Sequence, residues 1–175
     1  MKPTAVTWAL LGLLSQRPRS GYDLKQAVDR SIRHFWAASY GQIYPELGRL
    51  EAAGWITGES ASADGRRRRS YRITEAGRAA LIGWLHGVES RHELRDESLL
   101  RLFFADVAPV EQGLGLLRAR REGYAAMRTY LESLDDGSGV PDTPFTDLVY
   151  RWGLDHCAWG EEWCRQQEDR LRSGG

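Results

Sequence analysis

Apolar residues recur at helical spacing along most of this chain, and short polar or glycine-containing stretches separate the runs. Residues 4–15 are almost entirely apolar, which predicts a buried first helix. A proline-containing turn is expected over residues 16–20. Ser20 then caps a second helix, with Asp23 at the position where a carboxylate completes the cap. These segments predict the first half of a small helical unit.

A third helix is expected to start at Ser39, because Gln42 three residues later completes an S-x-x-Q capping box. Its core face repeats at i, i+4 and i+7: Ile43, Leu47 and Leu50. Gly54 ends this helix, as a glycine just past a helix C-terminus commonly does.

A β-hairpin follows the third helix. Residues 55–58 and 70–73 predict two short strands, and the polar stretch between them, residues 59–69, ends in a basic run. Thr74 then caps a fourth helix of about a dozen residues. Three helices followed by a hairpin with a charged tip predict an N-terminal winged helix-turn-helix.

The second half of the chain is helical by its pattern. We expect one helix near residues 93–104, a longer one starting at Pro109, a break over residues 135–141, and a last long helix starting at residues 143–144. Neither long helix can bury its apolar stripe alone. The stripe of the last helix comprises Phe145, Leu148, Trp152, His156, Trp159 and Trp163. The expected fold is therefore mainly α, with a winged helix-turn-helix (three helices plus a β-hairpin wing) over residues 1–87 and a helical dimerisation domain over residues 88–175.

The distribution of charge supports this division. The 175-residue chain holds 24 basic and 24 acidic side chains, so its formal net charge is zero. Residues 1–87 nevertheless carry a net charge of +6, and residues 88–175 a net charge of −6. A basic first half and an acidic second half indicate two modules, of which only the first suits phosphate groups.

The face of the third helix opposite its core residues carries little bulk, and this feature favours DNA as the partner. That face comprises Gly41, Pro45, Gly48 and Ala52. Gln42 and Arg49 flank it on one side and Tyr44 on the other. Such a helix can lie close in the major groove, where Gln pairs with adenine and Arg with guanine or phosphate. The alternative is a solvent-facing helix whose small residues have no partner.

Four consecutive arginines, Arg66, Arg67, Arg68 and Arg69, stand at the expected hairpin tip. A run of charge is often only a solvated surface, and arginine outnumbers lysine 22 to 2 in this chain, which indicates a compositional bias. Their position beside the candidate recognition helix favours contact with phosphates or the minor groove.

Three sequence blocks resemble the PadR family of bacterial transcription regulators. They read SGYDL at residues 20–24, FWAASYGQIYPEL at residues 35–47, and GRR with YRITEAG at residues 65–67 and 71–77. The resemblance covers about residues 5–80. The rest resembles the C-terminal domain of the larger members in pattern and length. Arg67 stands where wings of this family often have proline, so a less rigid, more cationic wing is expected.

The resemblance implies a homodimer that binds a double-stranded DNA operator and usually represses transcription. It also implies that the C-terminal helices pair the subunits, and that phenolic acids or other aromatic molecules act as effectors of some members. The candidate DNA-binding residues are Tyr22, Lys25, Ser39, Tyr40, Gln42, Tyr44, Arg49, Arg66, Arg67, Arg68 and Arg69.

The tryptophans suggest a place for such an effector. A cleft between the two modules is one hypothesis, since domain junctions often hold apolar pockets with a few polar groups. The candidate pocket residues are Trp8, Tyr150, Trp152, His156 and Trp159. An aromatic stripe at helical spacing is more often core or dimer interface, and that simpler interpretation stays open beside the pocket.

Several other classes of function find no support. Cys157 and Cys164 lie two helical turns apart, too far for a disulfide, and with His156 they lack metal-ligand spacing, so no metal or cofactor is expected and a reducing cytoplasm fits. The apolar run 5–14 is too short to span a membrane. No motif of an enzyme active site is found. The alternative to a DNA-binding regulator is a helical protein–protein adaptor that retains a winged-helix fold.

Overall fold

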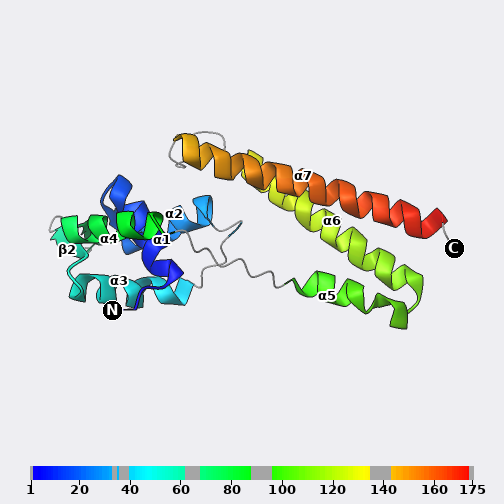
Figure 1. Cartoon of the computed structure of the whole chain (residues 1–175), viewed down its shortest axis with the longest axis horizontal. Coiled ribbons are helices and arrows are strands. Elements are labelled where there is room, and N and C mark those ends of the chain that lie inside the picture. The colour runs from blue at the N-terminus through cyan, green and yellow to red at the C-terminus, as the bar shows by residue number, and fades with distance from the viewer. Residues whose placement is uncertain are drawn as a thin grey trace. The chain divides into compact units, whose positions relative to one another are not determined.

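The computed structural model describes residues 2–32, 35, 40–61, 68–87, 96–134 and 143–173. The chain forms two compact units, Met1–Arg91 (unit 1) and His92–Gly175 (unit 2), as Figure 1 shows. The expected domain boundary after residue 87 borders residues 88–95, which lie outside the described residues.

Unit 1 contains the expected helices in the expected order. They are α1 (Ala5–Gln16), α2 (Gly21–Ser31), a 3-10 turn η1 (Tyr40–Gln42), α3 (Ile43–Ala52) and α4 (Glu75–Leu85). The predicted caps are confirmed: the Ser20 hydroxyl accepts a hydrogen bond from the Asp23 amide at 3.2 Å, and the Thr74 hydroxyl accepts one from the Gly77 amide at 3.1 Å. These caps supply partners for amides that the helices cannot satisfy themselves.

The core of unit 1 is built on α1 and α3. The fully buried side chains include Leu10, Leu11 and Leu14 of α1, Leu24 of α2, and Ile43, Leu47 and Leu50 of α3. The predicted core face of the third helix is therefore confirmed. Burial of these apolar side chains is the main favourable contribution to folding of the unit.

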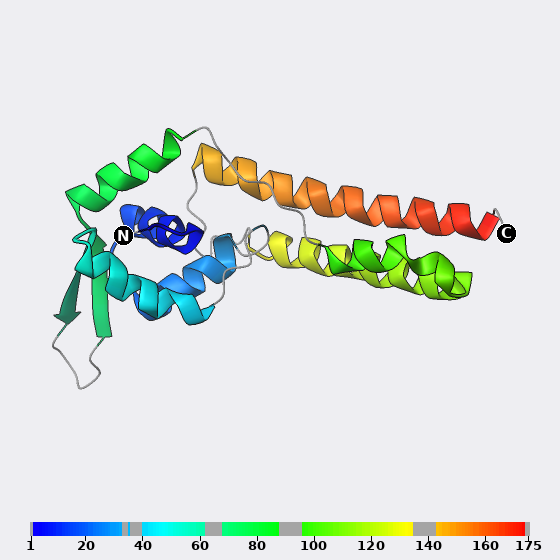
Figure 2. The ribbon, with the colours of Figure 1, turned by 60° about the horizontal axis from the view of Figure 1, so that its bottom comes forward.

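The hairpin is longer than expected and gains a third strand. Strands β2 (Ile56–Ala61) and β3 (Arg68–Ile73) pair antiparallel, and β1 (Arg19–Ser20) pairs with the other edge of β3. The prediction of a plain turn at residues 16–20 was therefore wrong for its last two residues. The backbone of Arg19 and Ser20 pairs with hydrogen-bonding groups of β3 that β2 leaves open. Figure 2 shows β2 and β3 as neighbouring arrows.

The start of α3 also differs from the prediction. The α-helix begins at Ile43, after the 3-10 turn, and Gln42 occupies the N-cap position without a side-chain cap hydrogen bond in this described segment. Ser39, the expected cap, lies outside the described residues. Pro45 accounts for the shift, because proline has no amide hydrogen and is tolerated in the first turn of a helix but not farther in. Gly54 adopts a φ of 71°, which confirms the expected end of α3.

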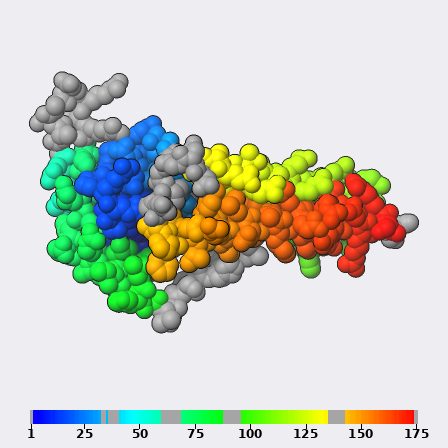
Figure 3. All heavy atoms as spheres, turned by 90° about the horizontal axis from the view of Figure 1, so that it is seen from above, coloured from blue at the N-terminus to red at the C-terminus, as the bar shows by residue number. Residues whose placement is uncertain are grey.

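Unit 2 is a long helical hairpin with a shorter arm. It comprises α5 (Glu97–Phe103), a 3-10 turn η2 (Ala105–Val107), α6 (Val110–Glu132) and α7 (Pro144–Ser173). Helices α6 and α7 pack side by side, as Figure 3 shows for the orange-to-red α7 and the yellow-to-green α6. From the sequence, the helix that corresponds to α5 is expected to start near residue 93. The described part of this helix starts at its N-cap, Asp96, and residues 93–95 lie outside the described residues.

Small residues, not the aromatic stripe, form the face that α7 turns toward α6. The buried positions of α7 are Gly153, Cys157, Gly160, Cys164 and Glu168. A Cβ atom added at Gly160 would lie 2.5 Å from the Tyr124 ring of α6, so glycine is required for this close approach. The aromatic stripe stays largely outside the hairpin: Phe145 is 80% exposed, Trp152 53% and Trp159 60%.

A partly buried ion pair connects the short arm to α6. Asp96 caps α5 by accepting hydrogen bonds from the amides of Ser98 at 2.9 Å and Leu99 at 3.1 Å. Arg120 of α6 donates to the other Asp96 oxygen at 2.7 Å and to the Tyr124 hydroxyl at 2.7 Å. Partial burial alone raises the pKa of Asp96, but the hydrogen bonds from Ser98, Arg120 and the Leu99 amide outweigh burial and lower this pKa to about 2.

We expect acid to weaken unit 2 through this carboxylate. Because the pKa falls from 3.8 to about 2 on folding, its contribution is fully present above pH 3.8 and disappears as the pH falls toward 2. Asp96→Asn keeps a good helix cap, so it should cost about 2 kcal/mol or less of unfolding free energy near neutral pH, and the difference should shrink below about pH 4. Urea unfolding followed by circular dichroism at several pH values measures the loss of unfolding free energy and its dependence on pH.

Glu162→Gln is the matched control for this measurement. Hydrogen bonds from Arg165 and Gln166 also lower the pKa of Glu162 to about 2, but this side chain lies at the surface, where water screens the pair. A stability loss that is the same for both variants, or independent of pH for Asp96→Asn, contradicts the interpretation.

Candidate nucleic-acid interface

The outer face of α3 is bare and exposed. Pro45, Gly48 and Ala52 are all solvent-exposed, on the side of the helix opposite its core residues, and Gly41 of the preceding turn η1 is exposed as well. Figure 2 shows α3 (cyan) on the outside of unit 1. A helix without bulky side chains on its open face can approach a flat or grooved surface closely.

Gln42 and Tyr44 flank this face and are both exposed. The Tyr44 ring lies against the start of α2, where a Cβ atom at Gly21 would come within 2.6 Å of it. The neighbouring Tyr22 is exposed, and its hydroxyl accepts a hydrogen bond from Gln26 at 2.9 Å. The close approach at Gly21 therefore brings the first turn of α2 beside the first turn of α3. The candidate Lys25 is also exposed on α2.

Arg49 is held by a carboxylate that the sequence pattern did not single out. Its Nη1 donates to Glu46 Oε2 at 3.0 Å, and its Nη2 donates to the Lys2 carbonyl at 3.5 Å. Glu46 is only 4% exposed and also accepts a hydrogen bond from the Thr7 hydroxyl of α1. The missed signal was the spacing itself, since position 46 is i+3 from Ile43 and hence on the core side.

Arg69 is the only one of the four consecutive arginines whose side chain lies within the described residues, and its partners belong to α3 and β3. Its Nη2 donates to Glu51 of α3 at 2.6 Å, and its guanidinium lies 5.6 Å from the centre of the Tyr71 ring. The same Glu51 oxygen accepts the Gly58 amide of β2 at 3.0 Å. Arg69 thus links the hairpin to the end of α3.

Five other DNA-binding candidates have no described side chain. Arg66 and Arg67 lie outside the described residues, and so does Ser39. Arg68 and Tyr40 contribute only backbone, in β3 and η1. Their roles stay predictions.

The effector candidates belong to both units. In unit 1, Trp8 stacks on Trp84 at 5.3 Å and on Trp55 at 6.0 Å between ring centres. In unit 2, His156 stacks on Trp152 at 5.2 Å and on Trp159 at 6.1 Å. We call Trp152, His156, Trp159 and Trp163, which continues the stack, the aromatic ladder of α7.

The remaining candidate, Tyr150, directs its hydroxyl toward α6. This hydroxyl donates a hydrogen bond to the Leu131 carbonyl at 3.2 Å. Of the two polar effector candidates, His156 and Tyr150, only His156 belongs to the aromatic ladder. Tyr124 of α6 contacts the His156 ring edge-on, at 5.6 Å between ring centres.

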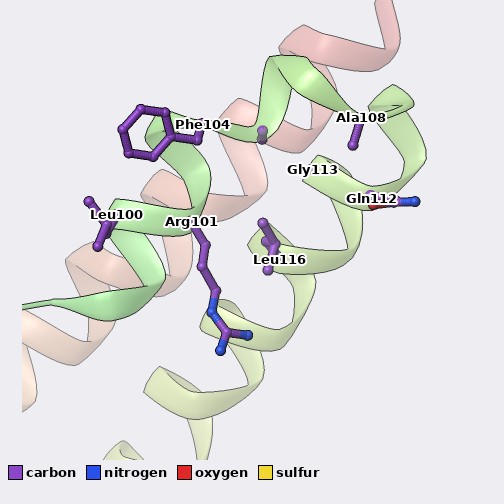
Figure 4. Close-up of a pocket in the computed structure, with 8 residues that line it drawn as sticks. Leu100, Arg101, Phe104, Ala108, Gln112, Gly113 and Leu116 are labelled. Carbon is purple, nitrogen blue, oxygen red and sulfur yellow. The ribbon is translucent and has the colours of Figure 1, made fainter.

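A groove that the sequence pattern did not reveal lies between α5 and α6, with a volume of about 410 Å³. Figure 4 shows Leu100 of α5, Phe104 just after this helix and Leu116 of α6 lining it, with the Arg101 side chain extending past Leu116. It contains none of the predicted effector residues. The available signal for a hydrophobic surface here was the segment 99–104, which is apolar except for Arg101.

Within the described residues we find no indication of a metal site, a reactive cysteine or a membrane-spanning helix. They contain no group of three or more His, Cys, Asp or Glu side chains arranged to hold a metal ion. Cys157 and Cys164 are free and buried, and burial raises the pKa of both thiols, so neither is activated as a nucleophile. None of the helices described has the length and hydrophobicity needed to cross a bilayer.

Comparison with known proteins identifies both units. Residues 10–82 match the transcriptional regulator PadR-like family, and residues 94–172 match the virulence activator alpha C-terminal family. A probable transcriptional regulator of Mycobacterium tuberculosis, Rv1176c, is 30% identical over 82% of this chain and 78% of its own. The negative transcriptional regulator PadR of Bacillus subtilis is 33% identical over 55% of this chain, and the match spans about half (54%) of that protein.

Solved structures share the whole fold. The PadR-like regulator BC1756 of Bacillus cereus superposes with a TM-score of 0.86 at 24% identity, covering 97% of this chain and 99% of that one. Bacillus subtilis PadR bound to operator DNA superposes with a TM-score of 0.84 at 24% identity, covering 96% and 99%, and it has also been solved with p-coumaric acid. With a winged helix-turn-helix followed by the long helical hairpin, this chain belongs to the PadR-like family of transcriptional regulators.

Proposed function

We propose that this protein binds a DNA operator through α3 and the hairpin of unit 1, as a homodimer, and represses transcription. The observation that carries this proposal is the bare, exposed face of α3, which Gln42 and Arg49 flank on one side and Tyr44 on the other. A recognition helix of this kind places its flanking side chains against base edges in the major groove. The negative regulator PadR of Bacillus subtilis, which binds operator DNA, supports both the partner and the direction of regulation.

The two parts of the interface have different tasks in this proposal. Gln42 and Arg49 stand on the helix and supply hydrogen bonds to bases. Arg66, Arg67 and Arg68 of the wing supply charge near the phosphates, and binding through charge depends on salt and little on sequence. Arg69 holds the hairpin through Glu51, so we assign it a supporting part.

Dimerisation is assigned to unit 2. The α6–α7 hairpin leaves large apolar side chains of α7 in water, among them Phe145, Leu148 and Val149. Exposed apolar patches of this kind usually mark an interaction surface. A two-fold dimer would present two recognition helices to an inverted repeat.

An aromatic effector is assigned to the aromatic ladder of α7. Two of its rings, Trp152 and Trp159, stand more than half exposed on either side of His156, which offers a polar group between flat apolar surfaces. p-Coumaric acid, the ligand of Bacillus subtilis PadR, is a molecule of the matching chemistry. A ligand that prefers one arrangement of the dimer shifts the protein away from the DNA-binding state.

The division of labour on DNA predicts two kinds of mutant. Gln42→Ala should cost about 1–3 kcal/mol on a duplex selected from a random pool and little on a scrambled duplex. The triple change Arg66→Ala, Arg67→Ala and Arg68→Ala should weaken both complexes, and should flatten the log–log salt dependence by about 0.9 for each phosphate that the wing no longer neutralises. Fluorescence anisotropy at several salt concentrations measures both effects. Equal losses on the two duplexes for both variants would falsify the assignment.

The dimer assignment predicts that a charge on the exposed apolar stripe of α7 dissociates the subunits. Phe145→Glu and Leu148→Glu should each shift the protein toward a monomer, because burying an unpaired carboxylate is costly. Light scattering on a sizing column measures the mass. Thr129→Glu, an exposed polar position on α6, is the control and should leave the mass unchanged. Dimers of normal stability in both α7 variants would place the interface elsewhere.

The effector assignment predicts coupled fluorescence and DNA release. Phenolic acids, p-coumaric acid included, should quench tryptophan fluorescence and release the selected duplex over the same concentration range. Trp159→Ala should abolish both responses, because it removes one wall of the ladder. Trp84→Ala, an exposed tryptophan of unit 1, should keep them. Quenching that survives Trp159→Ala unchanged, or quenching without DNA release, removes the support for this site.

A further inference from the structure

A buried carboxylate lies under the DNA-facing side of α3. Glu46 is 4% exposed, although it belongs to the helix that we assign to the major groove. One of its oxygens accepts a hydrogen bond from the Thr7 hydroxyl of α1, which is itself fully buried. The other accepts one from Arg49 Nη1 at 3.0 Å. The carboxylate therefore connects the core helix α1 with an arginine of the recognition helix.

The fold alone gives little reason for a charge at this position. Removing a carboxylate from water is costly, and an apolar residue of similar size often serves stability as well or better. The partner of Glu46 is, however, only partly buried: the Arg49 side chain is 50% exposed. The buried charge therefore acts on a guanidinium that reaches the surface of α3.

The neighbouring groups restrict the orientation of this guanidinium. Nη1 is held by Glu46, and Nη2 lies 3.5 Å from the Lys2 carbonyl of the segment before α1. A guanidinium carries five N–H donors in a rigid fork, so these two hydrogen bonds leave donors for DNA. An arginine held in this way loses less rotamer freedom when it forms a directional hydrogen-bond pair.

The charge of Glu46 has a second consequence. An arginine paired with a carboxylate attracts phosphates less strongly than a free one, because the two charges partly cancel. Its directional hydrogen bonds to a base edge remain possible. Pairing thus reduces attraction to any DNA more than it reduces recognition of a chosen base.

We propose that Glu46 is a positioning residue that determines sequence specificity by orienting Arg49 toward a base edge and by reducing its attraction to phosphates. This inference rests on the proposed DNA-binding function of α3. It predicts that Glu46 affects the ratio of affinities for selected and scrambled duplexes, and that it does so only through Arg49.

A double-mutant cycle tests this prediction in the full-length protein. Glu46→Gln keeps the shape and removes the charge, so the affinity ratio should fall about tenfold, through weaker binding of the selected duplex and equal or stronger binding of the scrambled one. In an Arg49→Ala background, the same change should alter the ratio less than about twofold. Glu75→Gln removes one exposed carboxylate of unit 1 and should leave the ratio unchanged.

Thr7→Val provides a second variant that keeps both charges. It removes the hydroxyl that anchors Glu46 to α1, so the ratio should fall again, by less, and only while Arg49 is present. Thermal unfolding of each variant, with and without Arg49, records the loss of stability separately from the affinity ratio. This variant still tests the inference if Glu46→Gln fails to fold.

The outcomes separate the inference from the function on which it rests. A wild-type protein without preference for any selected duplex contradicts the proposed function itself. If the wild type shows a preference, the inference is overturned by an unchanged ratio in the foldable Glu46 and Thr7 variants. It is also overturned by a fall of equal size with and without Arg49, or by Arg49→Ala leaving the ratio as it was.

Discussion

The packing of one short helix against another determines the arrangement of unit 1. Helix α3 has ten residues, and Ile43, Leu47 and Leu50 place one side of it in the core beside α1. Because a helix has only one such face, this packing turns the bare side outward. Two carboxylates then connect the helix to its neighbours: Glu46 to α1, and Glu51 to the hairpin through Arg69. The orientation of the exposed face therefore depends on the buried one.

The elements of unit 1 that local rules control could be predicted from the sequence. The caps at Ser20 and Thr74, the core face of α3 and the glycine at its end depend on residues three or four positions apart, and the structure confirms all of them. The start of α3 was misjudged because the capping-box pattern was weighed without the requirement of Pro45 for the first turn. The strand at Arg19 was missed because its partner lies some fifty residues away.

In the candidate site, too, the features set by local spacing could be predicted and those set by side-chain contacts could not. The exposed residues of α3 followed from periodicity, whereas their partners did not. The pairing of Arg69 with Glu51 and that of Arg49 with Glu46 depend on side-chain geometry, which composition and spacing do not determine. In unit 2, the large aromatic residues marked a conspicuous stripe on α7. The packing against α6 instead uses glycine and cysteine, since close helix packing requires small side chains.

The residues of α7 that set its spacing from α6 are different from those that carry most of its exposed aromatic surface. The spacing of the hairpin is set by Gly153, Gly160 and the cysteines, which pack toward α6. The rings of the aromatic ladder occupy other positions of the same helix, and Trp152 and Trp159 keep most of their surface outside the hairpin. Substitution of Trp152 or Trp159 can therefore change what the exposed side of the helix touches, whereas His156 also contacts Tyr124 of α6. Most of the exposed aromatic surface of α7 can thus be altered while the glycines and cysteines that set the spacing of the two helices are kept.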